Sequence, residues 1–270
     1  MSVRLRLLYM TPYLIWLALF VVLPIGLIAV TSLTDIHGRP TLDNFARFFT
    51  PTYLTMAATS VWYAFLITVC SLAIAYPAAY ALTRTRHKAV WLLLIILPSW
   101  VNLLLKTYAF LGILALEGPL NAVLALLGAG PRPLLFTDFS FLLVSTYIFI
   151  PFMILPIFNA LEDIPRGLIE AAEDLGATRL DVFRRVIWPL SLDGVKMGAQ
   201  AVFIPALSLF MITRLIAGNR VITLGTAIEE HFLVTQDWGM GATIAVMLIV
   251  MMAATMALVG RRGLSAHGKR

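Results

Sequence analysis

Six long apolar stretches occupy most of this chain, and they decide the solvent in which it folds. They run from Leu7 to Val30, Tyr53 to Leu82, Val90 to Leu116, Ser140 to Leu161, Leu192 to Ile212 and Gly241 to Gly260. A helix rises about 1.5 Å per residue, so about 20 apolar residues cross the roughly 30 Å of hydrocarbon in a bilayer. Because backbone groups in lipid must bond within their own segment, such stretches are expected to be helices. The pattern predicts an all-α membrane protein with six transmembrane helices.

The composition agrees with a membrane protein, since 60% of the 270 residues are hydrophobic and only 13% are charged. A soluble domain of that composition would aggregate. The first stretch follows Arg4 and Arg6 as a secretory signal would, but it is too long for one and lacks an A-x-A site, which favours an uncleaved first span. The single cysteine, Cys70, lies inside the second stretch, so neither a disulfide framework nor a thiolate metal site is expected.

The basic residues predict how the chain is oriented. Most of the 20 Lys and Arg residues fall on one side of the predicted spans: Arg4, Arg6, Arg84, Arg86, Lys88, Arg166, Arg179, Arg184, Arg185, Lys196, Arg261, Arg262, Lys269 and Arg270. The other side holds Arg39, Arg47, Lys106, Arg132, Arg214 and Arg220. Short basic loops stay in the cytoplasm, which places both termini there, in a multi-pass protein of the cell's inner membrane. The net charge of +6 lies at membrane borders facing anionic lipid, so nucleic acid is not an expected partner.

The connection between the fourth and fifth stretches, residues 162–190, is densely charged. Its charged residues are Glu162, Asp163, Arg166, Glu170, Glu173, Asp174, Arg179, Asp181, Arg184 and Arg185. At about 2.5 to 3.5 kcal/mol per charge at the bilayer centre, this segment cannot enter lipid. We therefore expect a single transmembrane domain over residues 1–270 with a cytoplasmic loop at 162–190.

Locally this loop is expected to form two short helices. Pro165 suits the first turn of one, Gly176 its C-terminal turn, and Thr178 with Asp181 a capping box for the next. The predicted apolar faces are Leu168, Ala171, Ala172 and Leu175 in the first helix and Val182, Phe183, Val186 and Ile187 in the second. By periodicity alone, an amphipathic hairpin that merely connects two spans fits equally well.

A motif in this loop is more specific. Glu170, Ala171, Ala172 and Gly176, followed by Val186, Trp188 and Pro189, resemble the E-A-A-x-x-x-G-x9-I-x-L-P loop of binding-protein-dependent ABC importer permeases, with Val186 for isoleucine and Trp188 for leucine. Nearly the whole chain resembles the spermidine/putrescine permease branch, including the segments TLDNFARFF, FIPALSLFMITRLIAG and DWGMGAT. The resemblance implies a type I ABC importer permease-like fold.

The resemblance also implies a role for the loop and a set of partners. In that family the loop is a coupling helix seated in a cleft of a cytoplasmic ATPase, which assigns ATPase coupling to Glu170, Ala171, Ala172, Gly176 and Pro189. The expected partners are an ATP-binding subunit dimer, a second permease subunit and an external solute-binding protein. This chain would form half of the pathway and would not be an enzyme. It has no G-x-x-x-x-G-K-[ST] loop, so ATP is bound by a partner and no cofactor is expected here.

Candidates for contact with the solute are polar or aromatic residues in the third and fifth stretches, with Arg214 just after the fifth: Asn102, Lys106, Tyr108, Phe203, Ser208, Phe210 and Arg214. Some have a structural alternative, because Lys106 can extend its ammonium to the interface and aromatic residues such as Phe203 and Phe210 commonly pack membrane helices. Three acidic residues on the non-cytoplasmic side, Glu229, Glu230 and Asp237, are candidates for attracting a cation or docking the binding protein.

The family likeness favours a polyamine as the solute, but Arg214 and Arg220 argue against it. Polyamine permeases resembling this chain tend to carry an aspartate where it has Arg214, and an uncompensated arginine repels a cation. An anionic or zwitterionic solute such as a phosphonate or opine is the alternative. A membrane-integral enzyme or a channel is more remote, because the four histidines do not pair, G-x-S-x-G is absent and no inverted repeat is detectable.

Overall fold

The computed structural model describes residues 3–218 and 220–267, with side chains over 10–218 and 220–257. The described residues form helices and a single isolated bridge between Thr34 and Pro40. Five helical stretches are long and apolar enough to cross a membrane: Met10–Thr31, Pro51–Thr83, Leu103–Leu126, Asp138–Glu162 and Trp238–Ala257. The all-α membrane fold is therefore confirmed, with five candidate spans in place of the six predicted.

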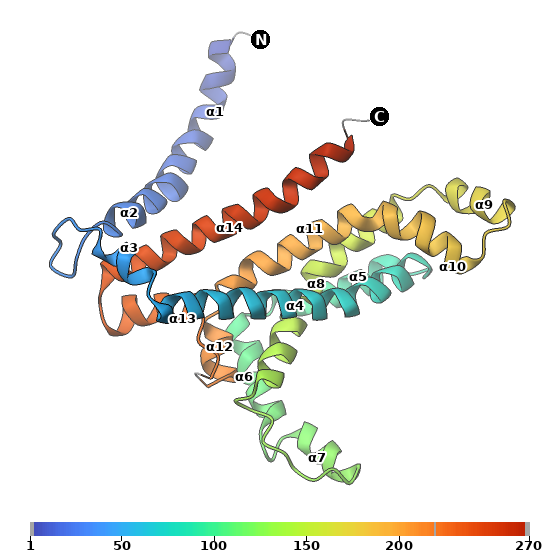
Figure 1. Cartoon of the computed structure of the whole chain (residues 1–270). Coiled ribbons are helices and arrows are strands. Elements are labelled where there is room, and N and C mark those ends of the chain that lie inside the picture. The colour runs from blue at the N-terminus through green and yellow to red at the C-terminus, as the bar shows by residue number, and fades with distance from the viewer. Residues whose placement is uncertain (1–2, 219, 268–270) are drawn as a thin grey trace.

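Three helices form the centre of the molecule: α4 (Pro51–Thr83), α8 (Asp138–Glu162) and α11 (Trp188–Leu207). They pack pairwise against one another, and Figure 1 shows them side by side along the long axis of the bundle. Glycine permits the closest approach, because a Cβ on Gly194 of α11 would lie 2.5 Å from both the Cβ of Ala160 and the carbonyl oxygen of Pro156 in α8. Real Cβ atoms do not come so close, so α8 and α11 can pack at this distance only with glycine at position 194.

The first and last helices form a second group. The chain begins with α1 (Val3–Leu17), η1 (Ala18–Val22) and α2 (Leu23–Thr31), and it ends with α14 (Trp238–His267), which packs along α2. Within Met10–Thr31 no residue in the most apolar window is buried, as expected of a helix whose surroundings are lipid. Figure 1 shows α1 and α14 diverging from the central helices.

The third predicted span, Val90–Leu116, is wrong as one helix. The chain forms α5 (Lys88–Ile96), a 3-10 turn η2 (Leu97–Trp100) and α6 (Leu103–Leu114), followed by α7 (Pro119–Leu126). Pro98 lacks an amide hydrogen and disfavours a helix through its own position. Asn102 then caps α6, its Oδ1 accepting a hydrogen bond from the Leu104 amide at 2.8 Å.

The fifth predicted span, Leu192–Ile212, is also interrupted. α11 ends at Leu207, and α12 (Met211–Ile216) follows after a break whose first residue, Ser208, donates a hydroxyl hydrogen bond to the Pro205 carbonyl at 3.1 Å. α11 has 20 residues but is not among the candidate spans, and Asp193 and Lys196 near its start lower its mean hydropathy. The break supports α13 (Leu224–Glu229), where Gly225 lies so close to the Ser208 carbonyl that a Cβ would be 2.5 Å away.

Two short π turns precede prolines at the same spacing. η1 (Ala18–Val22) ends two residues before Pro24, and η3 (Phe183–Ile187) ends two residues before Pro189. A proline inside a helix cannot donate to the carbonyl four residues back and clashes with it. The wider π turn accommodates that defect without ending the helix.

Candidate functional site

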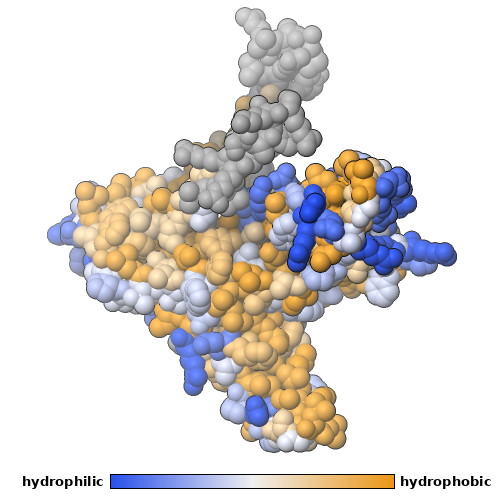
Figure 2. Space-filling view, turned by 45° about the vertical axis from the view of Figure 1, so that its right-hand side comes forward, coloured by the Kyte–Doolittle hydropathy of each residue, from blue (hydrophilic) through white to orange (hydrophobic). Residues whose placement is uncertain are grey.

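Residues 162–190 form a helical hairpin at one end of the bundle. It contains α9 (Arg166–Asp174), α10 (Arg179–Val182) and η3, which continues directly into α11. Pro165 stands just before α9 at its N-cap, one position earlier than the first-turn placement expected from the sequence. Figure 2 shows hydrophilic residues gathered at this end and again at the opposite end, with an apolar band between them.

The turn between α9 and α10 lies at Gly176, as the sequence predicted, and backbone hydrogen bonds fix it. Gly176 has φ of +83°, a left-handed conformation that favours glycine. The Gly176 amide donates to the Glu173 carbonyl at 2.9 Å, and the Ala177 amide to the Ala172 carbonyl at 3.0 Å. The predicted capping box is present between Thr178 and Asp181, and the hydrogen bond from the Thr178 hydroxyl lowers the pKa of the Asp181 carboxyl.

The apolar face predicted for α9 is divided in the structure. Ile169 and Ala172 turn inward and pack against the core, so Ala172 does not share a face with the other predicted residues. Leu168, Ala171 and Leu175 face solvent, with Leu175 89% exposed. An apolar stripe that does not pack against its own chain is typical of a site that binds another protein or a membrane. In the second short helix the predicted face does pack inward, with Val182 and Ile187 buried.

Aromatic rings tie the base of this hairpin to α4. Trp188 lies 5.0 Å from Tyr76 between ring centroids, and Phe183 lies 5.8 Å from Tyr80. The Tyr76 hydroxyl also makes a buried 2.8 Å hydrogen bond with the Ser191 hydroxyl. Trp188 replaces the leucine of the family motif, and its ring contacts both Tyr76 of α4 and Phe183 of the hairpin.

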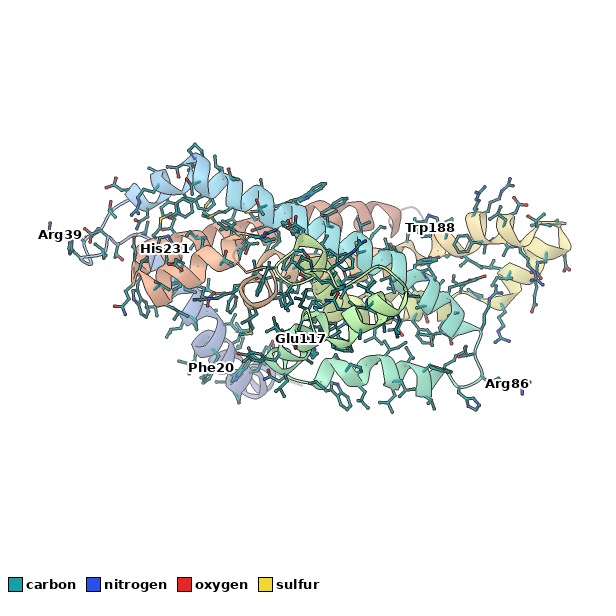
Figure 3. The ribbon with its side chains drawn as sticks, turned by 90° about the horizontal axis from the view of Figure 1, so that it is seen from below. Phe20, Arg39, Arg86, Glu117, Trp188 and His231 are labelled. Carbon is teal, nitrogen blue, oxygen red and sulfur yellow. The ribbon has the colours of Figure 1, made fainter. Side chains whose placement is uncertain are left out.

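A cavity of about 650 Å³ separates the hairpin from the α4–α5 turn. Arg84, Arg86, Lys88 and Arg166 line it together with Glu162, Glu170 and Glu173. Lys88 closes one side by a 2.7 Å ion pair with Glu162, which joins the start of α5 to the end of α8. Figure 3 shows Arg86 and Trp188 towards this end and Arg39 and His231 towards the other.

The pathway candidates are not brought together in one place. Lys106 of α6 lines a cavity between α5, α6 and α8, whereas Phe203 of α11 lines an apolar hollow with Trp62 and Met251. Asn102 caps α6, and Tyr108 is 57% exposed. Ser208 and Phe210 belong to the break after α11 and not to a continuous span.

Arg214 corrects the electrostatic argument made from the sequence. Its guanidinium forms a 2.7 Å ion pair with Glu229 of α13, whose side chain is only 15% exposed. The positive charge of Arg214 is therefore compensated, and the argument that it repels a cation is wrong. Two of the three acidic residues noted in the sequence are engaged in this way, since Asp237 pairs with Arg47 at 3.4 Å.

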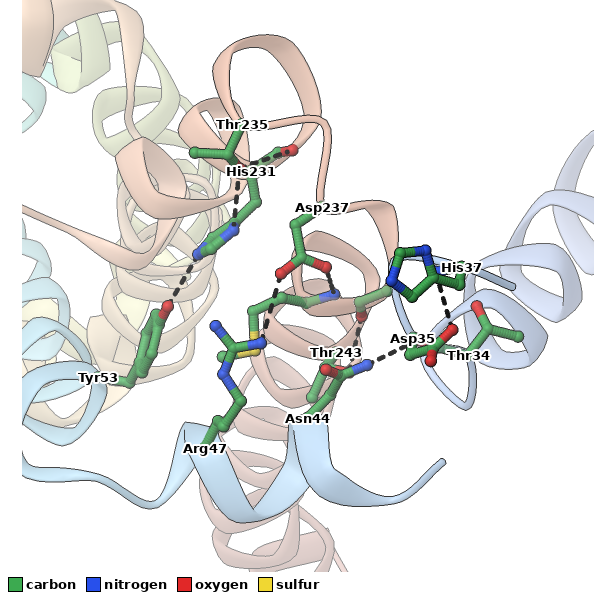
Figure 4. A network of polar contacts seen from close by, with 12 residues as sticks. Thr34, Asp35, His37, Asn44, Arg47, Tyr53, His231, Thr235, Asp237 and Thr243 are labelled. Carbon is green, nitrogen blue, oxygen red and sulfur yellow. Dashed lines mark hydrogen bonds and ion pairs between the residues drawn. The ribbon is translucent and has the colours of Figure 1, made fainter. Parts of the chain in front are cut away.

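At the end opposite α9, a network that sequence reasoning missed joins the start of α4 to the segment before α14. We call Arg47, Tyr53, His231 and Asp237 the distal clasp (Figure 4). The Tyr53 hydroxyl lies 2.8 Å from His231 Nε2, and Thr235 Oγ1 lies 3.3 Å from Nδ1. Burial lowers the pKa of the His231 imidazole. No local pattern signals these pairs, because their members lie far apart in the chain.

The described residues contain no group of three or more His, Cys, Asp or Glu side chains arranged to hold a metal ion.

The chain matches known transporters over most of its length. Residues 71–261 match the family model of the binding-protein-dependent transport system inner membrane component. The spermidine/putrescine transport system permease protein PotB of Escherichia coli is 34% identical over 247 residues, covering 88% of this chain and 90% of PotB, and the Haemophilus influenzae PotB is 33% identical over 248 residues, covering 88% and 87%. The inner membrane ABC transporter permease protein YdcU of Escherichia coli is 30% identical over 239 residues, covering 83% and 76%.

Solved structures show the same fold at lower identity. A chain of a bacterial ABC transporter involved in the import of the acidic polysaccharide alginate superposes with a TM-score of 0.77, at 15% identity, over 99% of this chain and 97% of that one. A bacterial alginate ABC transporter in complex with its pentasaccharide-bound periplasmic protein gives 0.80, also at 15% identity, over 95% and 93%. The chain thus belongs to the family of binding-protein-dependent transport system inner membrane components: it is a multi-pass inner-membrane permease subunit of an ABC importer that works with ATPase and binding-protein partners, and it is neither catalytic nor a cofactor carrier.

Proposed function

We propose that this permease imports polyamines, with residues 162–190 as the loop that couples it to the ATPase. The chain acts as one transmembrane domain, with α11 as a sixth crossing and both termini in the cytoplasm. A second permease subunit completes the pathway, of which Asn102, Lys106, Tyr108, Phe203, Ser208, Phe210 and Arg214 remain candidate lining residues. The family supplies the importer class, and the coupling assignment and the solute are our inferences.

The coupling role is carried by the exposed apolar stripe of α9. Leu168 and Leu175 are 48% and 89% exposed on a loop that is too charged to enter lipid. A large exposed apolar surface on a charged hairpin fits a protein partner. Trp188 at the base of the hairpin contacts Tyr76 of α4, so a movement of the loop is transmitted to the central helices.

The polyamine assignment rests on the PotB relatives and on the ion pair of Arg214. With Glu229 at 2.7 Å, Arg214 presents little net charge to a passing cation. Arg220, the second arginine that argued against a polyamine, lies beside α4 in an open hollow with Pro51 and Thr52. The electrostatic case for an anionic solute is thereby weakened.

The solute is tested by uptake into proteoliposomes that contain the complete importer with its binding protein and ATP. We expect spermidine or putrescine to accumulate, and a tenfold excess of a phosphonate or an opine to leave that uptake unchanged. Accumulation of the phosphonate or the opine in place of the polyamine would overturn the assignment and leave the importer class intact.

The coupling loop is tested by Gly176→Asp against a matched control. Gly38 has φ of +76°, Gly176 has φ of +83°, and an added Cβ meets nothing within 4 Å at either position. The two Asp substitutions therefore carry similar backbone strain, about 1 to 2 kcal/mol. We expect Gly176→Asp to abolish solute-stimulated ATP hydrolysis and Gly38→Asp to retain it. Normal stimulation in Gly176→Asp would remove the coupling assignment.

A further inference from the structure

Lys106 occupies an unusual place for a charged side chain. It lines a cavity of about 270 Å³ with Ser99 and Tyr147, and the remaining walls are apolar: Ile95, Pro98, Ile148, Ile150 and Pro151. Phe110, one helical turn further along α6, meets Tyr147 of α8 at 5.0 Å between ring centroids. Lys106 and Phe110 share a helix face, so the lysine lies on the side of α6 that approaches α8.

The depth of this cavity follows from α8, which spans Asp138–Glu162. Tyr147 is nine residues from the first end of that helix and Pro151 eleven residues from the other. At about 1.5 Å per residue, the part of α8 that faces Lys106 begins roughly 14 Å from the first end of the helix and stops roughly 17 Å short of the other. A lysine side chain reaches only about 6 Å, so extending the ammonium to the interface does not remove it from the membrane interior. The sequence-based alternative of a lysine near the outer interface is therefore disfavoured.

This charge has no counter-charge within the described part of the chain. None of the ion pairs found there includes Lys106, whereas Arg47 and Arg214 each have a carboxylate partner. Ionisable residues inside membranes are costly unless they are paired, and they face protein or water.

The helix break beside Lys106 gives an independent reason to place protein here. The chain tightens into a 3-10 helix at Leu97–Trp100 and is non-helical at Val101 and Asn102, and non-helical backbone at membrane depth is tolerated only where protein or a water-filled cavity covers it. Trp100 is 75% exposed and Leu105 64% exposed. Large apolar side chains around a broken backbone suit contact with the surface of another protein chain.

We propose that the second permease subunit presents an Asp or Glu carboxylate to Lys106, forming an ion pair between the two subunits within the membrane. Lipid tails offer no counter-charge, and the apolar cavity walls solvate an ammonium poorly. A polyamine, being a cation, cannot neutralise the lysine either. The inference rests on the proposed pairing of two permease subunits and names a contact that holds them together.

A zero-length crosslink tests this pair in the complete importer, reconstituted in nanodiscs. A membrane-permeable carbodiimide joins an amine to a carboxylate only when the two are in contact. We expect peptide mass spectrometry to find an amide between Lys106 and an acidic residue of the second permease. The Lys196–Asp193 pair, at 2.8 Å, is the internal positive control. In Lys106→Arg the charge remains but this crosslink should disappear, because a guanidinium is not coupled.

A second variant reports on assembly. Removing one partner of a buried ion pair leaves the other uncompensated, so Lys106→Met should lower recovery of the second permease at least about tenfold while Lys106→Arg retains it. If the Lys196–Asp193 amide forms and Lys106 stays unlinked, or links to a carboxylate of its own chain or of the binding protein, the inference is overturned. If the crosslink is missing, native mass spectrometry of the wild-type importer shows which proposal is wrong. Two permease chains in the complex would refute only the ion pair, whereas a single permease chain would refute both the ion pair and the proposed pairing of two permease subunits.

Discussion

Leu175 offers a direct measure of what the exposed stripe of α9 does. It is 89% exposed, so Leu175→Ala should leave the permease's own folding free energy almost unchanged. If an ATPase cleft buries it, the substitution removes three carbons from that contact. At about 0.8 kcal/mol per buried CH₂ the loss is up to about 2.4 kcal/mol, or about 60-fold in Kd. The assay is binding of the detached ATPase subunits to the permease assembly in nanodiscs, followed by biolayer interferometry.

Leu126 is a matched control for this measurement. It is 87% exposed on α7, which lies far from α9 in Figure 1, and Leu126→Ala removes the same three carbons. We expect its ATPase affinity to equal that of the wild type and both variants to unfold at the wild-type temperature. An affinity within twofold of wild type for Leu175→Ala, or an equal loss in Leu126→Ala, refutes burial of the stripe by the ATPase.

Three further predictions concern packing, coupling and pH. Gly194→Leu should destabilise the fold by about 3 kcal/mol, because its Cβ would overlap α8. Gly26→Leu, whose Cβ would meet nothing within 4 Å, should be neutral in thermal unfolding. Trp188→Ala should lower solute-stimulated ATP hydrolysis about tenfold by removing the packing contact with Tyr76, whereas Trp188→Leu should keep most of the wild-type rate because it still packs there. Equal rates in the two variants would contradict a role for this packing contact. Burial lowers the pKa of the His231 imidazole, so as the pH falls the unfolded state binds a proton at this residue before the folded state does. Thermal stability should therefore fall as the pH drops below about 6.5, and His231→Gln should flatten this pH dependence.

Features of the hairpin at 162–190 were predictable because they are local. A φ of +83° at Gly176 and the Thr178–Asp181 capping box depend on residues within a few positions of one another. The division of the α9 face was not predictable in the same way. Periodicity assigns Ala172 and Leu175 to one apolar stripe, but only the position of the core decides that Ala172 packs inward and Leu175 stays exposed.

The interruption of the third predicted span was visible in the sequence, but average hydropathy does not detect it. Averaging over the third stretch hides Pro98 and Asn102, which are a helix breaker and a helix cap within five residues. The break after α11 involves a contact that is distant in the sequence, because Gly225 packs against the carbonyl of Ser208, the C-cap residue of α11. Hydropathy therefore located membrane segments and missed where their helices stop.

The ion pairs between distant residues could not be predicted from the sequence, and they change the argument about which solute is transported. Arg47 and Arg214 appear in the sequence as isolated positive charges on the non-cytoplasmic side. In the structure they lie 3.4 Å from Asp237 and 2.7 Å from Glu229, partners 190 and 15 residues away. A cation approaching this side therefore meets locally compensated charge at Arg47 and at Arg214, so the objection raised against a polyamine is left to rest on Arg220 alone. Lys106 differs from both, since it has no such partner in the described chain and lies far deeper, and this contrast points to a counter-charge supplied by another subunit.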